Sequence, residues 1–84
     1  MTARMIERPA EVVVEVPNRW DAVDLTHRLP ACRWFMVARD ERRWEVHVTL
    51  EQARPRLRED LEQLTETWAR TRLGSAGTVE RVES

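Results

Sequence analysis

Lysine and tyrosine are absent from this 84-residue sequence, so all 14 of its basic residues are arginines. Without lysine the chain has no amine for Schiff-base chemistry, and without tyrosine it has no phenol that could act as an acid. Residues with AT-rich codons are scarce in general, which indicates a GC-rich, bacterial-type genome. We therefore attribute the missing lysines to mutational bias rather than to function.

Cysteine and histidine are rare. Because Cys32 is the single cysteine, an internal disulfide is excluded, whereas small secreted domains usually carry several. Cys32, His27 and His47 lack the spacing of a metal site, so we expect no metal and no cofactor. The N-terminal residues contain no signal-peptide core. The expected location is therefore the cytoplasm.

Long apolar runs and glycine-rich loops are also missing. No stretch approaches the roughly 20 apolar residues that a membrane-spanning helix needs. The formal net charge of −1 does not favour a basic membrane or nucleic-acid binder. Both glycines, Gly74 and Gly77, follow the last expected helix, which excludes a phosphate loop or nucleophile elbow before it. Since no convergent acid–base or nucleophile set is recognisable, we expect no catalytic activity.

What the chain does contain is a regular series of strand and helix patterns. Period-two runs of β-branched and aromatic residues predict strands over 11–16, 32–39 and 43–50. Residues 78–83 fit a short last strand or a frayed tail. Residues 1–10 are expected to be a flexible lead-in.

Two helices are predicted between and after these strands. Asn18 is a good N-cap, and Pro30 ends the first helix. Pro55 fits the first position of the second helix, although a capping box at 49–52 would allow an earlier start. The apolar seam of the second helix is Leu57, Leu61, Leu64 and Trp68. Gly74 follows this helix as a C-cap glycine does, and 75–77 is expected to be a loop.

The element order is βαββα, or βαββαβ if the last strand forms. Over residues 11–73 this order resembles the ferredoxin-like two-layer sandwich, in which two helices cover one face of a sheet. The resemblance concerns shape and includes no family motif, so it does not imply a function. It divides the chain into a lead-in (1–10), one α+β domain (11–74) and a tail or edge strand (75–84). The crossover is expected to place the first and third of the predicted strands side by side and parallel.

The register of the second strand decides which side chains face the helices. An odd number of loop residues after it puts Trp34 and Met36 beneath the helices, whereas an even number puts Phe35 and Val37 there. The even loop would drive Arg33 toward the core, where an unpaired charge costs on the order of several kcal/mol. We therefore expect Phe35 and Val37 on the uncovered face.

The uncovered face then has an apolar centre and a rim of mixed charge, a composition typical of protein interfaces. The expected interface residues are Val13, Phe35, Val37, Arg33, Arg39, Glu45 and His47. The sequence thus predicts a non-catalytic association or regulatory module that homodimerises through this face around Phe35 and Val37. Another protein is the second choice of partner.

An alternative function is nucleic-acid binding by the arginine and aromatic residues of 33–44. Residues 28–44 carry five arginines against Asp40 and Glu41, and interleaved aromatic and basic side chains suit single strands. The overall charge and the glutamates expected on the same face make nucleic acid an unlikely partner.

A weaker hypothesis concerns Arg54, Arg56 and Arg58, which crowd the start of the second helix. Guanidinium groups at a helix N-terminus suit phosphate or carboxylate. The simpler interpretation is helical pairing of Arg56 with Asp60 and of Arg58 with Glu62, and we favour it.

The four tryptophans and the cysteine are interpreted as structural. Trp34, Trp44 and Trp68 fall on inward positions and are expected in the core. Trp20, near the start of the first helix, is a partner-facing anchor or a lid over the sheet edge. Cys32 is expected to be a buried, inert thiol.

Overall fold

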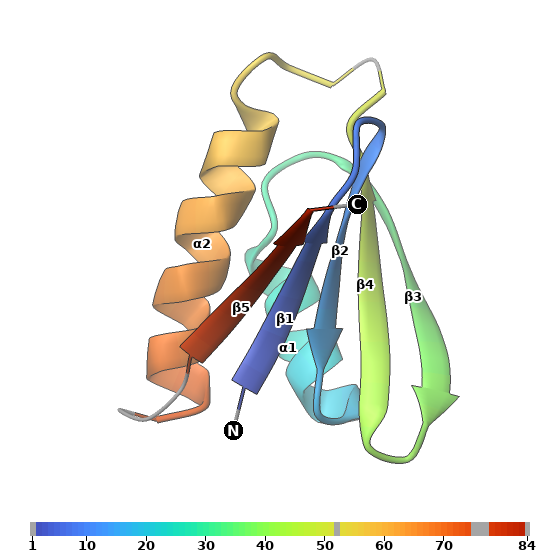
Figure 1. The fold of residues 1–84 in the computed structure, drawn as a ribbon, viewed down its shortest axis with the longest axis vertical. Coiled ribbons are helices and arrows are strands. Elements are labelled where there is room, and N and C mark those ends of the chain that lie inside the picture. Colours follow the sequence, from blue (N-terminus) through green and yellow to red (C-terminus); the bar gives the residue numbers. More distant parts are fainter. Residues whose placement is uncertain (1, 52, 75–77, 84) are drawn as a thin grey trace.

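The strands form one five-stranded mixed sheet, and both helices lie on the same face of it (Figure 1). The computed structural model describes residues 2–51, 53–74 and 78–83. In chain order the elements are β1 (Thr2–Glu7), β2 (Glu11–Val16), α1 (Arg19–Arg28), β3 (Arg33–Asp40), β4 (Arg43–Thr49), α2 (Leu57–Arg72) and β5 (Thr78–Glu83). The strands lie in the order β3-β4-β2-β1-β5. The fold is therefore α+β with two layers.

β1 occupies the segment for which a flexible lead-in was expected. It pairs antiparallel with β2 and parallel with β5, so the last segment of the chain is a strand rather than a frayed tail. Ala3 and Met5 point to the helix layer and are fully buried. A turn joins β1 to β2, in which the Arg8 N–H donates to the Glu11 carbonyl at 2.9 Å. Because β1 lies between β2 and β5, the strand order differs from that of the ferredoxin-like sandwich.

The expected neighbours β2 and β4 do lie side by side, but they are antiparallel. The prediction of a parallel pair was wrong because the crossover through α1 leads to β3, not to β4. The hairpin after β3 then brings β4 back into the space between β3 and β2.

The hairpin register agrees with the preferred interpretation. Met36 lies opposite Val46 and packs against the core, whereas Phe35 lies opposite His47 on the other face. The register shifts between Ala38 and Asp40, so Arg39 occupies a β-bulge rather than the predicted position opposite Arg43.

α1 begins as the sequence predicted. The Asn18 side chain accepts a hydrogen bond from the Asp21 backbone N–H at 2.9 Å, and the helix ends at Arg28. The side chains of Asp21 and Asp24 join the two helices. Asp21 accepts from Arg72 at 2.9 Å, and the Trp68 indole N–H donates to Asp24 at 2.8 Å. This indole bond holds the pKa of Asp24 below its ordinary value.

α2 begins two residues after the predicted Pro55. The Leu57 N–H donates to the Arg54 carbonyl at 3.2 Å, so residues 54–57 form a turn before the helix. At the other end Gly74 has φ +89°, which fits the left-handed C-cap conformation expected there. The capping box at 49–52 and the loop at 75–77 include residues outside the described part of the chain.

The core lies between the sheet and the two helices. The buried apolar residues in it are Ala3, Met5, Val12, Val14, Val16, Ala22, Leu25, Val46, Val48, Leu57, Leu61, Trp68 and Ala69. Trp68 is in the core as predicted, and Trp44 is partly buried against it. Trp34 is 42% exposed, contrary to the prediction, because β3 is an edge strand that the helices cover poorly. None of the helices in the described residues is long and apolar enough to cross a membrane.

Candidate interface on the open sheet face

The face of the sheet without helices, called the open face below, carries an apolar row across all five strands. Strand pairing aligns Phe35 with His47, His47 with Val13, Val13 with Ile6 and Ile6 with Val82. We call these five residues the central row. Four of the five are hydrophobic, and Phe35 at one end is 51% exposed. The open face therefore has a mainly hydrophobic row from one edge strand to the other, interrupted by His47.

A second row beside it is charged. The same pairings align Val37, Glu45, Glu15, Arg4 and Glu80. Arg4 approaches Glu15 at 3.8 Å, and Arg39 from the bulge reaches Glu45 at 3.0 Å. Most charges of this second row are therefore neutralised by contacts within the sheet.

His47 is the centre of a polar network in the central row. Its Nε2 lies 2.9 Å from Glu45 Oε1, and its Nδ1 lies 3.4 Å from Glu11 Oε2. The ring stacks on Phe35 with 4.7 Å between the ring centroids and 10° between the planes. Three of the five strands thus contribute one partner each to the imidazole: β3 the phenyl ring, β2 and β4 a carboxylate each.

These contacts bury polar groups on a face that no helix covers. Val13 is 1% exposed, Glu45 7% and His47 8%. Burial acts to raise the pKa of Glu45, but the hydrogen bonds with His47 and Arg39 outweigh it and leave this pKa below its ordinary value. The hydrogen bond from Arg8, at 2.6 Å, together with the contact to His47, also lowers the pKa of Glu11. Both carboxylates are therefore held in the charged form.

Unpaired charges lie at the edges of the open face. Within the described residues Arg33 and Arg43, on the β3–β4 side, form no ion pair. The same holds for Glu80 on β5, at the opposite edge. Between them, at one end of the face, Arg4, Glu15, Arg43 and Glu80 help to line a hollow of about 400 Å³. Unpaired arginines thus lie on the β3–β4 side of the open face, and an unpaired glutamate lies on β5.

The sequence analysis placed seven residues on this face, and all seven belong to the two rows or border them. It missed Arg4, Ile6, Glu80 and Val82. The signal for β1 was present, since Ala3 and Met5 alternate with Arg4 and Ile6. Three charged residues among the first eight obscured that alternation.

The arginine and aromatic residues of 33–44 do not share one surface. Trp34 points to the helix side and Phe35 to the open face, because successive residues of a strand alternate. The stretch therefore does not form the single stacking platform that nucleic-acid binding would use.

The three arginines near the start of α2 are each occupied by a different carboxylate. Arg54 contacts Asp60 at 2.9 Å, and Arg56 contacts Glu59 at 3.6 Å. Arg58 reaches Glu7 of β1 at 3.5 Å rather than pairing within the helix. These contacts differ from the predicted helical pairs, and they leave no cluster of free guanidinium groups among the described residues.

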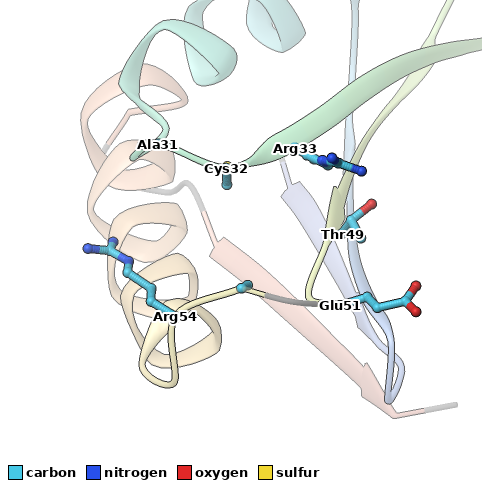
Figure 2. A pocket seen from close by; sticks show the side chains of 7 residues that line it. Ala31, Cys32, Arg33, Thr49, Glu51 and Arg54 are labelled. Carbon is cyan, nitrogen blue, oxygen red and sulfur yellow. The ribbon is translucent and has the colours of Figure 1, made fainter.

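Cys32 lines a hollow of about 310 Å³ between the start of β3 and the segment before α2 (Figure 2). Its thiol is partly buried, and burial raises its pKa. The charge of Arg54, which lines the same hollow, acts to lower this pKa, but burial outweighs it. His47 lies on the opposite face of the sheet, so it does not activate the thiol.

Comparison with known proteins gives no match: no family model fits the chain, and no curated protein or solved structure is significantly similar to it. In the described part of the chain no group of three or more His, Cys, Asp or Glu residues is arranged to hold a metal ion. A functional assignment therefore depends on the geometry of the open face.

Proposed function

We propose that this protein is a non-catalytic association module that homodimerises through its open face. The observation that carries the proposal is the central row: four hydrophobic residues and His47 aligned across the sheet, with a half-exposed phenyl ring at one end, on a face that no helix covers. Aromatic side chains such as this ring are enriched at protein interfaces. The cytoplasmic location expected from the sequence belongs to the same proposal.

A second copy is the partner that fits the two rows. Consider two open faces stacked about a two-fold axis parallel to the strands. β3 of one copy then lies over β5 of its partner, and β4 lies over β1. In the central row Phe35 meets the partner's Val82, and His47 meets the partner's Ile6. In the second row Glu45 meets the partner's Arg4. Phe35 therefore faces an apolar side chain and Glu45 faces an opposite charge, whereas Glu15 faces the partner's Glu15 and Val37 faces the partner's Glu80.

The size of the face is compatible with this arrangement. Five strands about 4.8 Å apart and six residues long at about 3.3 Å per residue give roughly 500 Å² in flat projection. This projected area is smaller than the about 800 Å² per partner of a standard interface and corresponds to a weaker association. Sheets stacked face to face lie about 10 Å apart with strands inclined by about 30°.

Molecular mass in solution tests the proposal. We expect sedimentation equilibrium to give twice the chain mass of 10.0 kDa, and Phe35→Arg to give the monomer because a buried guanidinium would lack a partner. Trp34→Arg is the matched control, since Trp34 is the adjacent residue on β3, similarly exposed, but on the other face. A wild-type monomer at high concentration, or a Phe35→Arg dimer as stable as wild type, would refute homodimerisation through this face.

A further inference from the structure

The hollow at one end of the open face is lined mainly by charged side chains. Arg42 and Arg43 line it from the β3–β4 hairpin, and Arg4 lines it from β1. Two carboxylates complete the lining, Glu15 on β2 and Glu80 on β5. The hollow encloses about 400 Å³, which lies within the range of roughly 300–1,000 Å³ for sites that hold small molecules. A single chain forms it, so an occupant does not require the proposed homodimer.

Two of the guanidinium groups in this hollow have no carboxylate partner. Within residues 2–51, 53–74 and 78–83 neither Arg42 nor Arg43 forms an ion pair. The carboxylate of Asp40, in the same hairpin, instead accepts a hydrogen bond from the backbone N–H of Arg42 at 2.8 Å. Guanidinium groups present paired N–H donors that match the oxygens of a carboxylate or a phosphate. The hairpin end of the hollow is therefore suited to an oxyanion.

Arg4 adds a third guanidinium group whose donors are incompletely used. Its Nε is buried and has no hydrogen-bond partner in the described part of the chain. Its Nη1 lies 3.8 Å from the Glu15 carboxylate, which is too far for a hydrogen bond. A buried N–H donor without an acceptor is costly. An oxyanion in the hollow that Arg4 lines would offer acceptors to this group.

The two carboxylates of the hollow limit the negative charge that an occupant can carry. β2 and β1 separate β4 from β5, so the backbones that bear Arg43 and Glu80 are three strand spacings, or roughly 14 Å, apart. One anionic group fits at the hairpin end, whereas a polyanion such as a nucleic acid would also meet Glu15 and Glu80. We infer that this hollow binds a small molecule through one oxyanion group, a carboxylate or a phosphate, held by Arg42, Arg43 and Arg4.

Titration with inorganic phosphate at constant ionic strength, followed by ¹H–¹⁵N NMR, tests the inference. We expect saturable shifts of the Arg4 Nε–H signal and of the backbone N–H signals of Arg42 and Arg43. The double variant Arg42→Gln, Arg43→Gln should raise the dissociation constant about tenfold or more, because two charged donor groups are lost. A parallel titration with acetate shows whether the hollow prefers the carboxylate or the phosphate.

The matched control is the double variant Arg33→Gln, Arg70→Gln. It removes the same charge from two exposed arginines that do not line this hollow and that form no ion pair with the described residues. We expect its dissociation constant to stay within about twofold of the wild-type value. An equal loss in the control would show attraction to net charge alone and would overturn the inference. The absence of saturable shifts with both probes would also overturn it, and neither result bears on the homodimer, which sedimentation tests separately.

Discussion

Single side chains on the open face are buried by their neighbours rather than by a covering layer. Glu45 shows what this requires, because it lies beneath the Arg39 guanidinium and against the His47 ring. A carboxylate in such a place is tolerated only with hydrogen bonds that replace water. Its lowered pKa has a consequence for acid stability.

We predict that Glu45→Gln destabilises the fold at pH 7 and much less at pH 3. A folded-state pKa below the unfolded one gives stability that is present above the ordinary carboxyl pKa of 4.5 and is lost as the pH falls through the folded-state pKa. At pH 7 the loss of two charge-assisted partners should cost about 1–2 kcal/mol in urea unfolding. Glu41→Gln, in the exposed hairpin turn, should change stability by less than about 0.5 kcal/mol. An equal loss at both pH values would show that the charge of Glu45 is irrelevant.

At the scale of elements, local signals account for the parts of the fold that the sequence predicted. Asn18 placed the start of α1, and Gly74 placed the end of α2. The cost of burying Arg33 placed Phe35 on the open face. Each of these inferences depended on residues close together in the chain or on one charge.

The sequence did not reveal β1, because its support comes from distant segments. β1 pairs with β2 through a short turn, but it also pairs with β5, more than seventy residues away. A local pattern interrupted by Arg4 and Glu7 did not indicate that contact. The direction of β4 was missed for a related reason. The crossover after β2 was expected to make β4, its neighbour in the sheet, parallel to it, whereas the crossover joins β2 to β3. Because β1 was not predicted, the residues of the open face on β1 and β5 were not identified either.

Substitutions on the two faces of β1 should separate stability from association. Met5 is fully buried beneath the helices, whereas Ile6 belongs to the central row of the open face. Met5→Ala should cost about 2–5 kcal/mol in urea unfolding. Ile6→Ala should cost much less stability, since Ile6 is only partly buried, but it should weaken the dimer measured by sedimentation. A stable Met5→Ala variant would mean that β1 is not an integral strand.

At the scale of the whole molecule, the proposed homodimer has two candidate orientations that differ in their contacts. A two-fold axis parallel to the strands brings Phe35 over the partner's Val82. A two-fold axis across the strands brings Phe35 over the partner's Phe35 instead, and leaves Glu45 away from the partner's Arg4. Only the first orientation uses the opposite charges of the second row.

Thiol cross-linking distinguishes these orientations. In a Cys32→Ser background, which removes the native thiol, the double variant Phe35→Cys, Val82→Cys should give a covalent dimer with a short bismaleimide on a denaturing gel. Phe35→Cys alone should give little, because in the proposed orientation the two Phe35 positions lie at opposite edges of the stacked sheets. Five strands about 4.8 Å apart separate these edges by roughly 19 Å. Efficient cross-linking of the Phe35→Cys single variant would instead establish the axis across the strands, and the pairing of Glu45 with the partner's Arg4 would be wrong.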